Sequence, residues 1–334
     1  MSVIEVRDLV KSYGDRRAVD GVSFQVEPGE VYALLGENGA GKSTTVEILE
    51  GHRERSAGEV TVLGVDPIDA GRDFRDRIGV VLQSAGIESE FSVREVVELY
   101  RSAYRDPRDL DEVLGLVGLE DQVDDRVGSL SGGQKRRVDL ALGIVGRPEV
   151  LFLDEPTTGF DPTARRRSWD LVEALCAGGT TVLLTTHYLD EAEHLADRVG
   201  VLMGGRLVAE GPPAQLIEGI SGTTVSFSLP DSVELSDAVD SLRAALATEL
   251  RVSGRLVQAN VDHPTQVVHR ATGWAIERRI ELEGLTVVRA SLEDAFLRLT
   301  DTGTDADTDP VSETGTDIDS VAETDAAAGR GPVA

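Results

Sequence analysis

The chain has 334 residues, of which 40% are hydrophobic, so it is long enough for one large or two medium-sized domains with a buried core. Sixty acidic against 33 basic residues give a net charge of −27, and only three of the basic residues are lysines. A surface this negative repels phosphate backbones and anionic headgroups, which argues against nucleic-acid binding and against docking on a membrane through a basic patch.

The cysteine count and the hydropathy pattern indicate the cellular compartment. Cys176 is the single cysteine, which excludes an internal disulfide framework and a zinc site built from several cysteines. The first residues are charged and contain no long apolar run, so they do not resemble a secretory signal. No uncharged apolar stretch of about 18 residues occurs, which predicts that the chain does not span a membrane. We therefore expect a cytoplasmic protein.

Residues 1–212 are predicted to alternate between strands and helices. Short, almost continuous apolar runs are typical of strands buried on both faces of a helix-covered sheet. These runs are Val31–Leu35, Gly79–Leu82, Val150–Leu153, Thr181–Thr185 and Val199–Met203. Within residues 84–148 the pattern changes to amphipathic helix, as in Val93–Tyr104 and Asp109–Val117. The sequence thus predicts an α/β domain with a mainly helical subdomain.

Residues 213–300 are predicted to form a small α+β domain after the break at Gly211-Pro212-Pro213. The patterns follow the order β-α-β-β-α-β over Thr223–Leu229, Val233–Leu250, Arg251–Val261 (two strands), Pro264–Glu283 and Leu285–Ala290. This order is that of ferredoxin-like folds, with Leu292–Leu299 as an added helix. Residues 301–334 contain nine acids, one arginine and no aromatic residue, which predicts a disordered acidic tail.

The glycine-rich segment Gly36-Glu37-Asn38-Gly39-Ala40-Gly41-Lys42-Ser43 matches the P-loop pattern. It lies between a predicted buried strand and a predicted helix, Thr44–Leu49, which is the context that a P-loop requires; a chance glycine-rich turn is the weaker interpretation. Its glycines let backbone N–H groups point at phosphates, and the helix N-terminus adds a positive dipole. The residues expected to bind the nucleotide are Gly36, Asn38, Gly39, Gly41, Lys42, Ser43 and Thr44.

Two carboxylates follow the predicted strand Val150–Leu153. Asp154, at the strand end, can hold Mg²⁺ together with the Ser43 hydroxyl. Glu155 can accept a proton from an attacking water, a role that commonly contributes about 10²–10⁴-fold to a rate. In isolation these acids could simply close a strand or cap the next helix. A P-loop in the same α/β body favours ATP hydrolysis instead.

A second anion site is predicted at Ser131-Gly132-Gly133-Gln134, where a hydroxyl and bare N–H groups precede the predicted helix Gln134–Gly143. With Leu130 before it, this segment resembles the signature of ABC transporter ATP-binding subunits. The resemblance covers residues 3–212. It implies a dimer, of two copies or of related subunits, in which Ser131–Gln134 of one subunit closes on the ATP held by Lys42 of the other.

The resemblance assigns roles to four further residues. Tyr13 resembles the aromatic residue that stacks on adenine, although a core tyrosine at a strand end is the alternative. Gln83 resembles the glutamine that contacts Mg²⁺ and the attacking water. Asp161 matches the loop that crosses the dimer interface, with Phe160 where leucine is commoner. His187 resembles the histidine that contacts the γ-phosphate and orients the catalytic residues.

Two groups of charged residues allow other interpretations, a zinc site and a nucleic-acid site. His187, Glu191 and His194 would share one helical face with a metal-like spacing, but the helix is expected to start after His187, which disfavours zinc. Basic runs at Arg136, Arg137 and Arg165–Arg167 are interpreted as a solvated helix face rather than as a nucleic-acid site.

The resemblance implies an ATPase that uses ATP and Mg²⁺ and drives a separate transmembrane permease, to which it is bound on the inner face of the cell membrane. Export is favoured because Ser291-Leu292-Glu293-Asp294-Ala295-Phe296 resembles the C-terminal extension of daunorubicin-type drug-export subunits. A soluble ABC ATPase acting on a ribosome or nucleic acid, and an ATP-binding regulatory module, are the alternatives. The acid excess with few lysines resembles proteins from high salt, where self-repulsion is screened.

Overall fold

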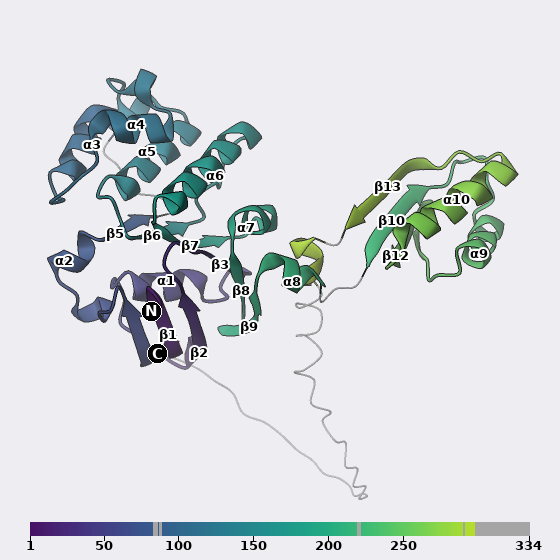
Figure 1. Ribbon diagram of the computed structural model, residues 1–334, viewed down its shortest axis with the longest axis horizontal. Coiled ribbons are helices and arrows are strands. Elements are labelled where there is room, and N and C mark those ends of the chain that lie inside the picture. Colours follow the sequence, from purple (N-terminus) through teal and green to yellow (C-terminus); the bar gives the residue numbers. More distant parts are fainter. Residues whose placement is uncertain (83–85, 87–88, 219–221, 290, 298–334) are drawn as a thin grey trace, which may run out of the picture.

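Figure 1 shows the computed structural model, which describes residues 1–82, 86, 89–218, 222–289 and 291–297. Gln83, the predicted disordered tail at residues 301–334 and the end of the predicted helix Leu292–Leu299 lie outside the described residues. Within the described part of the chain, every helix is too short or too polar to cross a membrane.

The central sheet has six strands in the order β5-β6-β7-β3-β8-β9. In that order they span Ile78–Val81, Val150–Asp154, Thr181–Thr186, Val31–Gly36, Arg198–Met203 and Arg206–Gly211. The first five run parallel at the predicted positions, and β9 pairs antiparallel with β8. Asp154 pairs with Thr185, and Leu35 pairs with Thr186, so β6, β7 and β3 end at the same edge of the sheet.

Each face of this sheet contributes to a different hydrophobic core. Val31, Ala33 and Leu35 of β3 point into one core, whereas Tyr32 and Leu34 point into the other, as the two-residue period of a strand requires. The first core contains α6 (Pro162–Ala177) and α7 (Leu189–Leu195). The second contains α1 (Lys42–Leu49) and the short α2 (Arg72–Arg75). Burial on both faces explains why the strands have almost continuous apolar sequences.

A second sheet covers the core on the α1 side. It has the antiparallel order β2-β1-β4, with β1 at Ile4–Tyr13, β2 at Arg16–Val26 and β4 at Ala57–Val62. The sequence analysis did not single out these strands. They mix buried and exposed positions, and the register of β1 shifts between Val6 and Leu9, so their apolar pattern is irregular.

The helical subdomain consists of α3 (Val93–Arg101), α4 (Leu110–Val117) and α5 (Gly132–Ile144), which lie at the predicted positions. Short 3₁₀ turns at Pro67–Asp69, Glu120–Gln122 and Val127–Ser129 complete this half of the chain. Helix α5 approaches the sheet very closely. A Cβ on Gly79 of β5 would lie 2.1 Å from the carbonyl oxygen of Gly143 of α5, so only glycine fits at this crossing.

After α8 (Pro213–Glu218), a C-terminal unit at residues 223–289 has its own core around Phe227, Leu242 and Trp274. Its elements are β10 (Thr223–Ser228), α9 (Leu235–Leu246), β11 (Arg251–Ser253), β12 (Leu256–Val261), α10 (Pro264–Arg278) and β13 (Glu283–Arg289). The strands form an antiparallel sheet in the order β11-β12-β10-β13. Helix α10 ends before the predicted Glu283 because Arg279 is left-handed, with φ of 54°. The ferredoxin-like comparison stays a prediction.

The crossing of α5 and β5 leads to a stability prediction. Gly79→Ala should lower the free energy of unfolding by about 1–3 kcal/mol, because the helix must move away from the sheet. Gly115→Ala is the matched control in α4, where the nearest atom to the new Cβ lies 3.8 Å away. It should leave stability unchanged or raise it by about 0.5–1 kcal/mol, since alanine favours a helix over glycine. Urea unfolding of the two variants measures the difference, and equal midpoints would contradict the close packing.

Candidate functional site

The predicted P-loop connects β3 to α1, and backbone sterics explain its glycines. Gly39 and Gly41 have φ angles of 84° and 106°, in the left-handed region that favours glycine. A Cβ on Gly41 would lie 2.4 Å from the carbonyl oxygen of Ala18, so alanine does not fit there. Gly41 directly precedes α1, whose first N–H groups have no acceptors within the helix. The segment therefore presents backbone donors at a helix N-terminus, which is an arrangement that binds phosphate.

Lys42 lies beneath the loop and is only 6% exposed. Its Nζ donates hydrogen bonds to the carbonyl oxygens of Gly36, at 2.6 Å, and Glu37, at 3.1 Å. Burial lowers the pKa of the ammonium, while the Glu155 and Asp154 carboxylates raise it. The cation is thus held inside the loop, where phosphate oxygens can replace the carbonyl oxygens as its acceptors.

A cavity of about 710 Å³ lies beside the P-loop. Tyr13, at the end of β1, lines it and is 43% exposed, so it is not a core tyrosine. Cationic groups of Lys11 and Arg53 lie 5.2 and 5.4 Å from the centre of its ring. The position favours stacking on a base. The predicted residues that line the same cavity are Asn38, Gly39, Gly41, Lys42, Ser43, Thr44 and Glu155.

Arg16 and Arg53 also line this cavity, and the sequence analysis did not predict them. Arg53 forms an ion pair with Glu47 of α1, and Arg16 approaches Gly39 of the P-loop. Both guanidinium groups border a cavity that the P-loop also lines, in a chain with a net charge of −27. No motif marks them because their proximity to the loop depends on how β1 and β2 pair and on the turn after α1.

One predicted Mg²⁺ ligand, Asp154, and two predicted catalytic residues, Glu155 and His187, meet at the ends of β6 and β7. The Thr185 hydroxyl donates a hydrogen bond to Oδ1 of Asp154, which fixes that carboxylate at the strand end. Glu155 has a left-handed backbone, with φ of 48°, and its N–H donates to the carbonyl oxygen of Thr185 at 3.0 Å. This turn directs Glu155 away from Asp154. Its Oε1 lies 3.2 Å from Nδ1 of His187.

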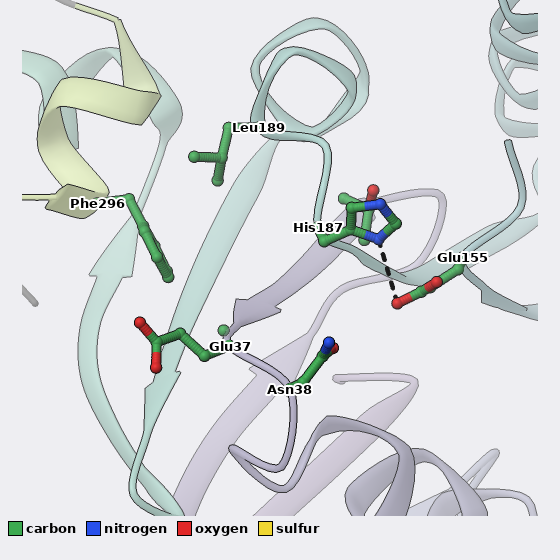
Figure 2. Close-up of a pocket in the computed structure, with 8 residues that line it drawn as sticks. Glu37, Asn38, Glu155, His187, Leu189 and Phe296 are labelled. Carbon is green, nitrogen blue, oxygen red and sulfur yellow. Dashed lines mark ion pairs between the residues drawn. The ribbon is translucent and has the colours of Figure 1, made fainter. Parts of the chain in front are cut away.

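The Glu155–His187 pair borders a second cavity, of about 420 Å³, on the other side of the P-loop (Figure 2). Glu37 and Asn38 of the loop line it, as do Leu189 and Phe296. The sequence analysis did not connect Phe296 with this site, because it lies in the segment after the C-terminal unit. The two cavities share Asn38 and Glu155, so they adjoin each other at the P-loop.

The residues present fit Mg²⁺ and ATP. Hydroxyl and carboxylate oxygens are the ligands that Mg²⁺ prefers, and it usually keeps several waters and phosphate oxygens. The exposed Ser43 hydroxyl and the Asp154 carboxylate supply such a pair beside the P-loop. The predicted contribution of Gln83 concerns a residue outside the described part of the chain.

The signature residues form the start of α5. Ser131 and Gln134 make a reciprocal capping box, in which the Ser131 hydroxyl accepts from the Gln134 N–H at 3.3 Å and the Gln134 Oε1 accepts from the Ser131 N–H at 2.8 Å. The N–H groups of Gly132 and Gly133 belong to the unsatisfied first turn. These four residues line neither of the two cavities described above.

Asp161 is the N-cap of α6. Its Oδ1 accepts hydrogen bonds from the N–H groups of Thr163, at 2.8 Å, and Ala164, at 2.9 Å. Phe160 beside it is buried in the first core. The capping interaction gives Asp161 a local role, and its predicted position at a dimer interface stays a prediction.

The zinc interpretation does not fit the geometry of α7. The helix starts at Leu189, after His187, as expected. Glu191 is fully buried and accepts from the Trp169 indole at 3.2 Å, while His194 pairs with Glu173 at 3.5 Å. Across the ranges that the structure describes, no three acidic, histidine or cysteine side chains are grouped as metal ligands.

Comparison with known proteins decides the family. The sequence profile described as ABC transporter matches residues 19–158, and one described as ABC transporter domain-containing protein-like, C-terminal domain matches residues 223–291. The chain is 40% identical over 303 residues to "Nod factor export ATP-binding protein I" of Burkholderia pseudomallei (strain 1710b), covering 89% of this chain and 96% of that protein. The chain belongs to the ABC transporter ATP-binding proteins.

Other relatives agree with this assignment. The protein of the same name from Rhizobium meliloti (strain 1021) is 42% identical over 308 residues, covering 89% of this chain and 88% of that protein. The ATP-binding subunit of an ABC transporter superposes with a TM-score of 0.61 at 28% identity, over 66% of this chain and 93% of that one. An ATP-binding cassette solved as a dimer with ADP and Pi superposes with a TM-score of 0.58 at 26% identity. The match covers 63% of this chain and 98% of that chain.

These comparisons confirm the predicted P-loop α/β fold and the predicted ATPase activity coupled to transport. The resemblance to daunorubicin-type subunits stays a prediction.

Arg136 corrects the sequence analysis, which placed it on a solvated helix face. It is only 6% exposed in this ABC protein. Its guanidinium donates to the carbonyl oxygens of Leu82, Asp154 (2.7 Å), Glu155 (3.0 Å) and Pro156 (3.1 Å). The side chain therefore ties α5 to the segment that carries Asp154 and Glu155. The sequence did not reveal this role because Arg136 lies in a run of basic residues. Only the fold shows that its side chain points inward from α5.

Arg136→Lys should lower ATP turnover and also lower the free energy of unfolding by about 2–4 kcal/mol. An ammonium keeps the charge but cannot donate in the same fork geometry to four carbonyl groups. Lys135→Ala is the control, because this neighbouring side chain is exposed. Turnover and urea unfolding of both variants measure the effect. Wild-type behaviour of Arg136→Lys would show that the carbonyl contacts do not matter.

Proposed function

We propose that this chain is the ATP-hydrolysing subunit of an exporter and that two subunits close on ATP. One observation carries the proposal: two helix N-termini that suit phosphate, after the P-loop and at the start of α5, occur in one chain, and the residues of the second line neither cavity beside the first. The catalytic candidates Asp154, Glu155 and His187 lie beside the first. A second subunit supplies the surface that would complete each site.

In this proposal the triphosphate lies on the backbone N–H groups of the P-loop, with the adenine stacked on Tyr13. The ammonium of Lys42 binds phosphate oxygens. Ser43 and Asp154 hold Mg²⁺, together with Gln83 as the resemblance implies; when bound, the ion neutralises charge on the phosphate oxygens. Arg16 and Arg53 add positive charge at the entrance.

Glu155 is the proposed general base. It accepts a proton from a water whose oxygen attacks the γ-phosphorus, and the bond from that phosphorus to the bridging oxygen breaks, which leaves ADP and phosphate. His187, 3.2 Å from Glu155, orients the carboxylate and contacts the γ-phosphate. Ser131–Gln134 of the opposite subunit cap the same phosphate, and Asp161 lies at the interface.

The dimer closes because ATP binds the closed state more tightly than the open state. ATP bridges two subunits only in the closed state and therefore favours it, and hydrolysis removes the bridging γ-phosphate and allows the dimer to open. The solved relative that is a dimer with ADP and Pi supports this view.

Glu155→Gln should bind ATP but not hydrolyse it, so with ATP and Mg²⁺ the protein should elute as a dimer in size-exclusion chromatography. Glutamine keeps the size of the side chain and removes the base. Adding Ser131→Arg to this variant should restore the monomer, because a bulky cation replaces the phosphate-capping hydroxyl. Equal dimer formation by the single and double variants would argue against the cross-subunit arrangement.

The proposed membrane partner contacts the helical subdomain. Leu99 and Tyr100 of α3, with Phe91 before it and Leu82 after β5, are large apolar side chains that are between 41% and 58% exposed. Such residues on and beside one helix suit an apolar segment of a permease. The subunit would then lie on the inner face of the membrane through its partner. The names of the curated relatives, which are export ATP-binding proteins, favour export.

Leu99→Asp should prevent co-purification with the permease from detergent-solubilised membranes, because it places a charge in the proposed apolar contact. ATP binding by the purified subunit should be unchanged. Val208→Asp on β9 is the control, since Val208 is similarly exposed, at 47%, but lies away from α3. Retention of the permease by Leu99→Asp would exclude this surface as the contact.

A further inference from the structure

The segment at residues 291–297 returns from the C-terminal unit and packs into the ATPase core. Leu292 is 1% exposed and Ala295 is 2% exposed, and both belong to the core that contains β3, β7 and α7. Phe296 packs against the same core. Residues 292–297 form a helix, coloured yellow in Figure 1, and Ser291 and Asp294 cap it reciprocally, with the Ser291 N–H donating to Asp294 at 2.9 Å.

This segment is also hydrogen-bonded to α7. The N–H of Leu292 donates to Oε2 of Glu193 at 3.0 Å. The bond joins positions 99 residues apart in the sequence, so it fixes the segment against a specific point on α7. The N–H groups at the start of a helix need acceptors, and Glu193 supplies one from the neighbouring helix.

Helix α7 begins two residues after His187. The helix starts at Leu189, and only Tyr188 separates it from the histidine. The N–H of Tyr188 donates to the Thr186 hydroxyl at 2.9 Å, and the Tyr188 and His187 rings lie 4.1 Å apart. Since α7 is seven residues long, a displacement at Glu193 is transmitted across less than two turns to His187.

Phe296 lines the cavity that the Glu155–His187 pair borders. Figure 2 shows Phe296 and Leu189 on one side of this cavity and the His187–Glu155 pair on the other, with Glu37 below. Residues from the far end of the described chain and from the P-loop thus border the same space.

The C-terminal unit is attached to the ATPase core at both ends. Before it, Leu216 and Ile217 of α8 pack against the first core. After it, β13 ends at Arg289, and a single residue separates it from Ser291. The second connection is thus a single residue of sequence between β13 and the 291–297 segment.

We propose that residues 291–297 form a positioning element for His187, through which the C-terminal unit sets the rate of ATP hydrolysis without changing ATP affinity. The proposal rests on the catalytic role of His187 given under the proposed function. Leu292 and Ala295 anchor the element in the core, the bond to Glu193 fixes α7, and Phe296 forms the wall facing the catalytic pair. Tyr13 and Lys42 line the other cavity, so the element acts on the catalytic pair and not on these nucleotide-binding side chains.

Steady-state ATP hydrolysis by the full-length chain tests this proposal. Phe296→Ala and Leu292→Ala should lower kcat by about 10-fold to 100-fold, as expected when a catalytic group is misplaced by about 1 Å. KM for ATP and the affinity for a non-hydrolysable ATP analogue should stay within about 2-fold, since an effect on kcat alone marks a contribution to the chemical step.

Glu193 offers a matched pair of variants. Glu193→Ala removes the acceptor of the Leu292 N–H and should lower kcat, whereas Glu193→Gln keeps an acceptor oxygen and should behave like the wild type. Ile276→Ala, on α10 and 76% exposed, is the control within the C-terminal unit and should leave kcat unchanged. If circular dichroism shows that Leu292→Ala does not fold, Phe296→Ala and the two Glu193 variants test the proposal without it.

The proposal is overturned if folded Phe296→Ala turns over ATP at the wild-type rate, or if its effect is confined to KM. It is equally overturned if Glu193→Ala and Glu193→Gln have the same kcat. His187→Ala separates the two hypotheses. Loss of turnover in His187→Ala with normal turnover in Phe296→Ala removes only this inference, whereas normal turnover in His187→Ala removes the catalytic role on which it rests.

Discussion

The parallel register of β3, β7 and β6 is the constraint on which the site depends. Because Leu35 pairs with Thr186 and Asp154 pairs with Thr185, three strands end at one level. Each strand then delivers a different chemical group to the same edge: backbone donors after β3, carboxylates after β6 and an imidazole after β7. Ligands of open α/β sheets bind at such carboxyl edges. A slip of one residue in any of these strands would exchange the side chains that face the two cores and dismantle the site.

Charge sets a second constraint, because a chain with a net charge of −27 must attract a polyphosphate. Positively charged side chains near the P-loop provide this attraction. Lys42 is held inside the P-loop, and Arg16 and Arg53 line the cavity at its entrance. Donors fixed in place before the ligand arrives need no reorganisation, which strengthens their interaction with charge. The attraction to a polyphosphate therefore comes from a few local groups and not from the overall charge of the chain.

Contacts across long sequence separations connect the parts of the ATPase. Arg136 links the signature helix to the carbonyl groups around Asp154 and Glu155, and the bond from Leu292 to Glu193 links the last described helix to α7. Both interactions join an element outside the central sheet to the edge where the catalytic candidates lie. Movement of the helical subdomain or of the C-terminal unit can thus reach the same few residues through short, specific contacts.

Local sequence patterns were enough to predict the α/β class, the buried strands, the P-loop and the acidic strand end, because apolar runs indicate burial and glycines indicate unusual backbone angles. The parallel pairing of the strands came from the structure. The sequence did not single out β1, β2 and β4, whose irregular apolar patterns carry a weaker signal. Only the tertiary structure decided that Arg136 is buried and that Phe296 borders the catalytic cavity. Their roles depend on packing between distant segments, and no local pattern of residues specifies which helix will face which strand end.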